Sequence, residues 1–228
     1  MKITKPARGL IGHRGAPKEF LENSLASFTA AIQQGLTWIE CDLFLTQDGH
    51  WVCTHDSNLQ RTHGISYEVA NYPLSALQNK LQQIKAPQLT TLPELLELAK
   101  AYEVTVNIEV KHTQDAPKLL DALHAADYAK VVVSSFHLSF ICSLRQLDPD
   151  IVIGMLVENF NQKALATVIA QKFNYLICNI EHIQAQDIAT CKEHHIPVLL
   201  YTCNTAQHAK YWLDCGVFGL FTDCPGLC

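Results

Sequence analysis

The chain has 228 residues, of which 48% are hydrophobic and only 17% are charged, so the sequence predicts a folded globular protein and excludes a disordered one. Seventeen Lys and Arg residues against twenty-two Asp and Glu residues give a formal net charge of −5. No basic run of the kind that follows a phosphate backbone is present, so we expect no nucleic-acid partner.

Short strand-like runs alternate with helical segments along the chain. Eight apolar runs are candidates for strands: Gly9–His13, Trp38–Leu43, Val104–Val110, Val131–Phe136, Ile151–Val157, Tyr175–Ile180, Pro197–Thr202 and Val217–Thr222. The segments between them carry apolar residues at helical spacing, for example Leu25, Phe28 and Ala31. We therefore predict an α/β fold, a (β/α)8 TIM barrel, with a doubly wound open sheet as the alternative.

Two segments after the second predicted strand interrupt this alternation. Residues 44–55 are typical of a β-hairpin, because Gln47-Asp48-Gly49-His50 is a turn signal between two apolar runs. Residues 57–91 are polar, and we expect a short insertion near the carboxyl-terminal rim of the barrel, where active sites are built. Since no linker rich in Gly, Pro or Ser divides the chain, we expect residues 1–228 to form a single domain.

The spacing of the cysteines and the length of the apolar stretches indicate where in the cell the protein is found. The nine cysteines are scattered singly, without a C-x-x-C pair, which is typical of reduced thiols. The N-terminus has no apolar region of a cleaved signal, and no uncharged apolar stretch reaches the roughly 18 residues of a membrane span. We expect a cytoplasmic protein without an integral membrane segment; its oligomeric state is not fixed by the sequence.

The first predicted strand ends in Gly12-His13-Arg14-Gly15. A glycine on each side allows a tight turn and the close approach of a ligand. Arg14 offers a planar fork that suits a phosphate, and His13 can transfer a proton near neutral pH. The motif indicates an anion-binding turn, and a structural histidine at a strand end explains it equally well.

The second predicted strand carries two carboxylates, Glu40 and Asp42, on either side of Cys41. Side chains alternate along a strand, so both carboxylates face the same side and Cys41 faces the other, where we assign it to packing. Like charges this close repel unless a cation lies between them, and oxygen ligands alone favour Mg²⁺ or Ca²⁺. Pairing with Lys or Arg from neighbouring strands is an equal alternative.

The third predicted strand repeats this spacing with Glu109 and Lys111. In a barrel, Glu109 would complete a carboxylate triad, and Lys111 would face the same mouth. His55-Asp56 closes the predicted hairpin and would return a second histidine to this mouth, although a surface turn is an equal explanation.

Six separated motifs combine into one pattern: His13-Arg14-Gly15, Glu22-Asn23, Glu40-x-Asp42, His55-Asp56 with Leu59-x-Arg61-Thr62, Glu109-x-Lys111 and Thr222-Asp223-x-Pro225. In their order and approximate spacing they resemble the glycerophosphodiester phosphodiesterase family, nearly from end to end. The fold of that family is a (β/α)8 barrel. The resemblance implies hydrolysis of a small-molecule glycerophosphodiester to sn-glycerol 3-phosphate and an alcohol, with a divalent cation.

The resemblance also implies a role for each candidate residue. The implied roles are metal ligands (Glu40, Asp42 and Glu109), general acid and base (His13 and His55) and phosphate-binding cations (Arg14 and Lys111). Such roles suit phosphodiester cleavage, which builds charge on the nonbridging oxygens and moves one proton at each end of the reaction. The assignment of acid and base stays open here, as does the attacking oxygen, which is either water or the neighbouring glycerol hydroxyl through a cyclic phosphate.

The sequence departs from the family pattern at a few positions. Leu21 stands where proline is common, Ser24 where threonine is usual, Tyr201 where tryptophan is frequent, and Phe218 where an acid is frequent. None of these is a candidate ligand or proton-transfer residue, so the departures bear on the preference for the alcohol rather than on activity.

Two other functions compete with this interpretation. A lipid-directed phosphodiesterase on a related barrel, phospholipase D-like or phosphoinositide-cleaving, is disfavoured because no amphipathic basic stretch suggests membrane docking. A noncatalytic phosphate-binding barrel has no need for two histidines beside a carboxylate triad. Among the remaining histidines, His112 and His137 are candidates for supporting residues near the site.

Overall fold

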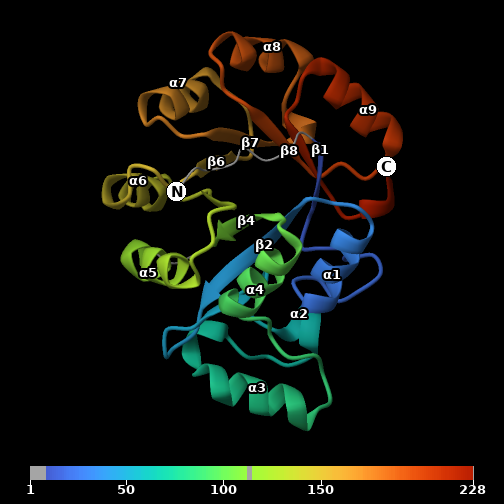
Figure 1. Ribbon diagram of the computed structural model, residues 1–228, viewed down its shortest axis with the longest axis vertical. Coiled ribbons are helices and arrows are strands. Elements are labelled where there is room, and N and C mark those ends of the chain that lie inside the picture. The colour runs from blue at the N-terminus through green and yellow to red at the C-terminus, as the bar shows by residue number, and fades with distance from the viewer. Residues whose placement is uncertain (1–8, 112–114, 228) are drawn as a thin grey trace.

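The computed structural model describes residues 9–111 and 115–227 of the chain. Eight parallel strands close into a barrel (Figure 1). They are β1 (Gly9–Gly12), β2 (Trp38–Leu45), β4 (Thr105–Val110), β5 (Val131–Ser135), β6 (Ile153–Val157), β7 (Tyr175–Asn179), β8 (Val198–Tyr201) and β9 (Gly219–Thr222). Because β1 pairs with β9 on one side and with β2 on the other, the ring is closed, which confirms the predicted barrel and rules out an open sheet.

Helices connect the successive strands and surround the barrel (Figure 1). They are α1 (Leu25–Gln33), α4 (Leu92–Tyr102), α5 (Ala116–Ala126), α6 (Leu138–Leu147), α7 (Gln162–Ala170), α8 (Ala185–Glu193) and α9 (Ala206–Cys215), with short 3-10 turns η2 (Ile180–His182) and η3 (Pro225–Leu227). Local sequence fixes their starts. Thr91 and Glu94 form a capping box at α4, and Ser24 caps α1 by accepting from the Ser27 amide.

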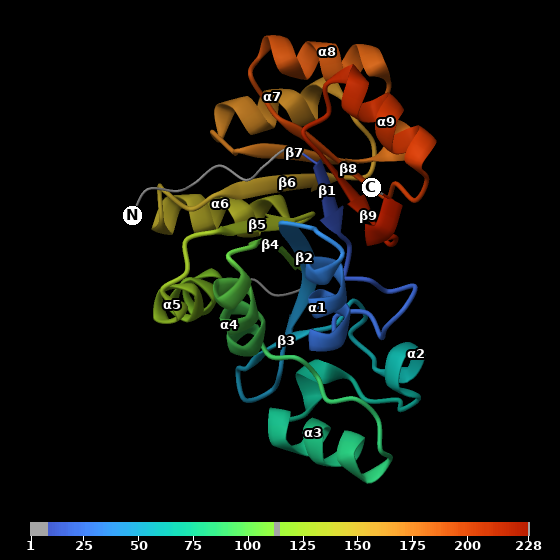
Figure 2. The same ribbon diagram turned by 45° about the vertical axis from the view of Figure 1, so that its right-hand side comes forward.

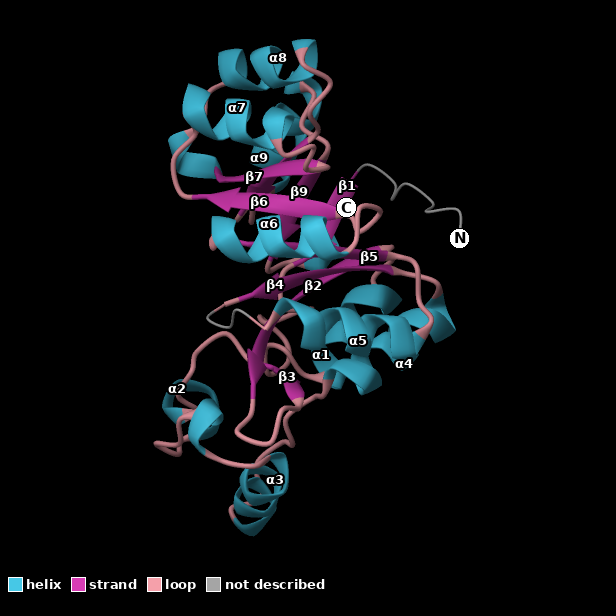
Figure 3. Ribbon diagram, turned by 90° about the vertical axis from the view of Figure 1, so that its left-hand side faces the viewer, coloured by secondary structure: helices cyan, strands magenta, loops and turns pink. Residues whose placement is uncertain are grey.

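The predicted hairpin and insertion follow β2. β3 (Trp51–Cys53) pairs antiparallel with the end of β2 outside the ring, which confirms the hairpin. The insertion contains α2 (Gln60–His63), the 3-10 turn η1 (Val69–Asn71) and α3 (Leu74–Gln83), and it projects from one end of the barrel (Figures 2 and 3). It has an apolar cluster of its own, built from Phe44, Val52, Leu59, Ile65, Val69, Leu77, Leu81 and Leu89.

The core has two layers, because successive side chains of each strand point to opposite faces. The layer inside the barrel includes Trp38, Ile177 and Leu199, and the larger layer between strands and helices includes Phe28 and Cys41. Cys41 therefore packs under the helices, as expected. Of the apolar residues expected at helical spacing in α1, Leu25 differs, because it is 37% exposed at the start of the helix.

Two further expectations concern thiols and membrane spans. The eight cysteines within residues 9–111 and 115–227 form no disulfide. In the same part of the chain, no helix is long and apolar enough to cross a membrane.

Candidate active site

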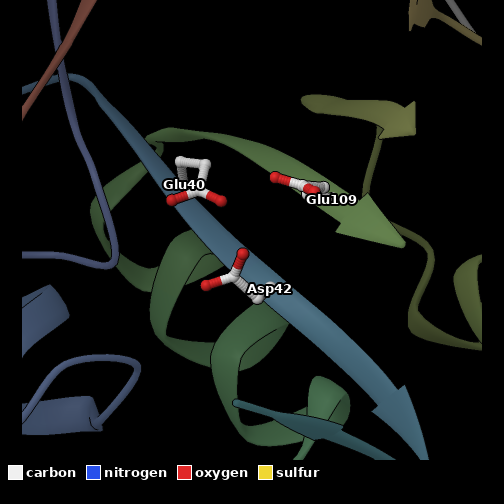
Figure 4. Close-up of side chains that lie close together, drawn as sticks. All are labelled: Glu40, Asp42 and Glu109. Carbon is white, nitrogen blue, oxygen red and sulfur yellow. The ribbon is translucent and has the colours of Figure 1, made fainter. Parts of the chain in front are cut away.

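Three carboxylates meet at the carboxyl-terminal mouth of the barrel. Glu40 and Asp42 point to the inner face of β2, on the side of Trp38, and Glu109 lies on β4 directly beside Asp42 in the sheet register. Glu40 is 2% exposed and Asp42 is fully buried. One oxygen from each of the three side chains lies within 4.8 Å of the others (Figure 4). The predicted triad is therefore brought together by strand alternation and barrel register.

Two cations lie against this carboxylate triad. The Nζ atom of Lys111 lies 2.9 Å from Oδ1 of Asp42 and 2.6 Å from Oε1 of Glu109. Nε of Arg14 lies 3.1 Å from Oδ2 of Asp42. The carboxylates do pair with basic residues, as the alternative interpretation expected. Their partners, Arg14 and Lys111, are the two residues that we expect to bind the phosphate.

The loop after β1 is held against the triad by its backbone. The Arg14 amide donates to Oε2 of Glu40 at 2.8 Å. Asn23 donates from its side chain to Asp42 at 2.8 Å and accepts from the Asp42 amide at 3.1 Å. Arg14 adopts a left-handed backbone with φ of 57°, which costs a non-glycine residue about 1 kcal/mol or more. Gly15 is needed beside it, because a Cβ there would lie 2.5 Å from Ser27.

The surroundings drive the pKa values of neighbouring carboxyls apart. Burial and the Asp42 charge raise the pKa of Glu40 from 4.5 to about 8. Burial would also raise the pKa of Asp42, but the Lys111 and Arg14 charges outweigh it and hold that pKa at about 2. Burial and the Asp42 charge raise the pKa of Glu109. At neutral pH, Glu40 therefore favours the protonated form and Asp42 the ionised form.

Each candidate histidine is fixed by an aspartate. Nδ1 of His13 lies 2.7 Å from Oδ1 of Asp223, and Asn204 donates to the other Asp223 oxygen at 2.8 Å. Nδ1 of His55 lies 2.7 Å from Oδ1 of Asp56. In both rings Nε2 is left for a proton exchange with a ligand.

The two histidines differ in protonation. Burial lowers the pKa of His13, but the hydrogen bond with Asp223 and the nearby carboxylates outweigh it, so this pKa is raised above 6.5. Burial lowers the pKa of His55; the Asp42 charge opposes this, but the Lys111 and Arg14 charges reinforce it. His13 therefore favours the protonated form more than His55 does.

Arg61, at the mouth, ties the insertion to both loops of the site. Its Nε donates to Asp56 at 2.5 Å, and its two terminal nitrogens donate to Glu22 at 2.7 and 2.6 Å. Glu22 in turn accepts from Arg14 at 3.1 Å. The orientation of the His55 loop is thus linked through one guanidinium to the Arg14 loop.

A cavity of about 250 Å³ opens at this mouth. It is lined by His13, Arg14, Glu40, His55, Asn107, Glu109, Lys111, Phe136, Leu156, Tyr201, Thr202 and Phe221. Larger hollows of about 590, 450 and 540 Å³ lie elsewhere on the barrel and contain none of the candidate residues, and a hollow of about 460 Å³ beside the cavity is lined in part by His55, Glu109 and Lys111. The cavity of about 250 Å³ is the candidate site, because six of the seven candidate residues line it.

The donor set fits a hard divalent cation. Asn107 lies beside Glu40 in the register of β2 and β4; it is 1% exposed, and its Oδ1 has no hydrogen-bond partner within residues 9–111 and 115–227. An unpartnered buried oxygen and three carboxylates offer oxygen ligands, which Mg²⁺ and Ca²⁺ prefer. Burial and the Asp42 charge raise the pKa of Glu40, and a cation bound between the carboxylates would favour its ionised form.

The seven predicted site residues all lie at this one mouth, but several of their partners were missed. Glu22, Asn23, Arg61 and Asp223 stood within the recognised motifs without a role, and Asn107 was not singled out; its signal is its position two residues before Glu109 on the same strand face. His137, one of the two supporting histidines expected near the site, lines a hollow together with His55. His112, the other, lies outside the described residues.

The fold and the site together define the class of protein. A (β/α)8 barrel whose carboxyl-terminal mouth joins acidic, basic and histidine side chains is typical of a barrel enzyme. The sequence matches the Glycerophosphoryl diester phosphodiesterase family over residues 13–227, and the chain belongs to this family.

Individual relatives agree with this membership. A "Glycerophosphodiester phosphodiesterase" of Caldanaerobacter subterraneus is 26% identical over 228 residues, which cover 95% of this chain and 94% of that protein. A phosphodiesterase of Oleispira antarctica, solved in complex with the product sn-glycerol-3-phosphate, superposes with a TM-score of 0.87 at 26% identity, over 96% of this chain and 94% of that chain. A lysophospholipase D of Mus musculus is 32% identical over 111 residues, which cover 44% of this chain and 35% of that protein.

Proposed function

We propose that the protein hydrolyses glycerophosphodiesters to sn-glycerol 3-phosphate and an alcohol with the help of Mg²⁺ or Ca²⁺. The observation that carries this proposal is the meeting of three carboxylates within 4.8 Å, flanked by two cations and by two aspartate-bound histidines. Family membership supports the reaction class, and the Oleispira antarctica neighbour, which holds sn-glycerol-3-phosphate, supports the product.

The carboxylate triad of Glu40, Asp42 and Glu109 would hold the cation. A bound cation would polarise the phosphoryl oxygens and offset the charge that builds on them. Arg14 and Lys111 lie against the same carboxylates and line the same cavity, so they would neutralise the remaining charge of the phosphate.

The histidines would carry the protons. His55, whose pKa is lowered, would act as the base that takes the proton of the attacking oxygen, from water or from the neighbouring glycerol hydroxyl. His13, whose pKa is raised by Asp223, would act as the acid that protonates the departing alkoxide. Asp223 and Asp56 would orient the two rings.

The proposal extends to the organisation of the chain. Residues 1–228 would act as one domain, because the last strand of the barrel pairs with the first and the family match runs from residue 13 to residue 227. The substrate would be a small molecule. The unpaired thiols among the described residues fit a reducing compartment such as the cytoplasm.

The direct test is the release of sn-glycerol 3-phosphate from glycerophosphocholine and glycerophosphoethanolamine by the purified protein with Mg²⁺, Ca²⁺ or a chelator. We expect cation-dependent release that Glu40→Gln lowers by about a hundredfold or more, and that the control Glu193→Gln on α8, at an exposed position, does not. Cation-independent release would refute the metal role.

Two outcomes would replace the proposed reaction. Turnover of lysophospholipid vesicles without turnover of the soluble diesters would favour a lipid-directed phosphodiesterase. Tight phosphate binding without turnover under any cation, in a folded protein, would favour a noncatalytic phosphate-binding barrel.

A further inference from the structure

The aspartate that binds His13 follows the neighbouring strand of the barrel, and an asparagine that follows the next strand binds this aspartate in turn. In the ring, β9 lies between β1 and β8 (Figure 2). His13 follows β1, Asp223 follows β9, and Asn204 lies in the loop between β8 and α9. The three side chains therefore meet in series along the carboxyl-terminal mouth of the barrel.

The Asn204 side chain binds Asp223 at two points. Its Oδ1 accepts from the Asp223 amide at 2.8 Å, and its Nδ2 donates to Oδ2 of Asp223 at 2.8 Å. The Thr222 hydroxyl lies 3.3 Å from the same Oδ1 of Asn204. Because a backbone amide can only donate, it determines which end of the Asn204 side chain is the oxygen. The nitrogen end therefore faces the Asp223 carboxylate.

The two oxygens of the Asp223 carboxylate have different partners. Oδ1 lies 2.7 Å from Nδ1 of His13, whereas Oδ2 accepts from Asn204. Burial would raise the pKa of Asp223, but the hydrogen bonds from His13 and Asn204 and the His13 charge outweigh it, so this pKa is lowered. An ionised carboxylate can only accept, so Nδ1 of His13 carries a proton and Nε2 is the nitrogen left for the substrate.

Neither the following helix nor the core depends on the Asn204 side chain. The side chain of Thr205, not that of Asn204, caps the start of α9. Asn204 is exposed, whereas Cys203 beside it is 1% exposed and belongs to the core. Within residues 9–111 and 115–227, the side-chain hydrogen bonds of Asn204 all reach the turn after β9. The contacts of this side chain therefore serve Asp223 rather than the packing of the barrel.

We propose that Asn204 is a positioning residue for His13, and that it acts by fixing the Asp223 carboxylate. The Asp223 side chain is 21% exposed, so without Asn204 its Oδ2 would be hydrated and the carboxylate could rotate away from Nδ1 of His13. The His13 ring would then lose the partner that fixes its orientation and its tautomer. The proposal rests on the proposed function, in which His13 protonates the departing alkoxide, and adds to it a residue that follows a third strand.

The test compares two substrates whose leaving groups differ in their need for a proton. The alkoxide of choline is a strong base and needs an acid in order to depart, whereas 4-nitrophenolate departs without a proton. With glycerophosphocholine, we expect Asn204→Ala to lower kcat about tenfold and to leave KM unchanged. With the 4-nitrophenyl ester of sn-glycerol 3-phosphate, kcat should fall less than about twofold.

A control variant and a double variant accompany this comparison. Asn159→Ala is the matched control, because Asn159 is an exposed asparagine in the loop after β6 and does not line the site cavity. Thermal unfolding checks that each variant is folded. Asp223→Ala should itself lower kcat with glycerophosphocholine, and the addition of Asn204→Ala should lower it no further, because the two residues act in series.

Three results would overturn the proposal. An equal loss of kcat with both esters in Asn204→Ala would mean that the residue supports the site as a whole and not the proton transfer. An unchanged kcat with both esters would mean that Asp223 needs no partner. Losses that multiply in the double variant would mean that Asn204 acts independently of Asp223.

If the parent protein cleaves neither ester, the proposed function fails, and NMR spectroscopy of the ¹⁵N-labelled protein still tests the positioning. The proton on Nδ1 of His13, assigned by its absence in His13→Gln, should give a downfield signal because Asp223 binds it. We expect Asn204→Ala to weaken or abolish this signal and Asn159→Ala to retain it. A signal that is unchanged in Asn204→Ala would refute the positioning role.

Discussion

In the cation-free protein, Glu40→Gln and Asp42→Asn should change the free energy of unfolding in opposite directions. The pKa of Glu40 rises from 4.5 in the unfolded chain to about 8 in the folded protein. A carboxyl with a raised pKa destabilises the fold as the pH rises above its unfolded value, and at pH 7 this amounts to about 3 kcal/mol. The carboxamide introduced by Glu40→Gln keeps an oxygen that can accept from the Arg14 amide, so this variant should be more stable than the parent by about 2–3 kcal/mol.

Asp42→Asn should destabilise the protein by about 3–5 kcal/mol, because it leaves two partly buried cations without a charged partner. Asp42 is fully buried between Lys111 and Arg14, and its lowered pKa means that its ionised form stabilises the fold above the unfolded pKa. This contribution is lost only as the pH falls towards about 2, the folded pKa.

Urea unfolding of the parent and the two variants in the presence of a chelator measures both effects. At pH 5 the gain from Glu40→Gln should shrink to below about 1 kcal/mol, because Glu40 is then protonated in the folded parent and partly protonated in the unfolded chain. The deficit of Asp42→Asn should persist at pH 5. Equal destabilisation by both variants, unchanged between pH 5 and pH 7, would refute the proposed charge distribution of the site.

Three further predictions concern the neighbours of the triad. Asp223→Asn removes a group that raises the pKa of His13, so the high-pH limb of the kcat/KM profile should move to lower pH; an unmoved limb would contradict the acid role. Arg61→Ala should lower kcat about tenfold by releasing the His55 loop, with little change in Tm because the Arg61 side chain is 50% exposed; a kcat equal to that of the parent would exclude this positioning role. Mg²⁺ or Ca²⁺ at 100 times its Kd should stabilise the parent by about 2.7 kcal/mol and raise Tm by about 5–11 °C, a shift that calorimetry should find mostly lost in Glu109→Gln.

The carboxylate triad was predictable because it depends on regular structure. The two-residue period of a strand places Glu40 and Asp42 on one face and Cys41 on the other, and this is what the structure shows. Neighbouring parallel strands of a closed barrel then bring Glu109 beside Asp42. The barrel was predictable for the same reason. The periods of strands and helices appear over a few residues of sequence, so the order of the elements can be predicted from the sequence.

The partners of the catalytic candidates depend on loop paths, which have no period. Asp223 is 210 residues from His13 in the chain, and Arg61 reaches Glu22 across 39 residues. Their sequence context alone does not show which charged group each would meet. The insertion has only a loose apolar pattern because its small core, which includes Leu77, is assembled from a hairpin, turns and one short helix rather than from one amphipathic element.

The pairing of His13 with Asp223 has a consequence for synthesis and folding. The triad and His55 come from the first 109 residues, whereas Asp223 follows the last strand of the barrel and meets His13 where β9 docks on β1. His13 gains its aspartate only when β9 has paired with β1 and the ring is complete. With His13 in its proposed role as the acid, turnover would depend on barrel closure, and a fluorogenic diester would time that docking step during refolding.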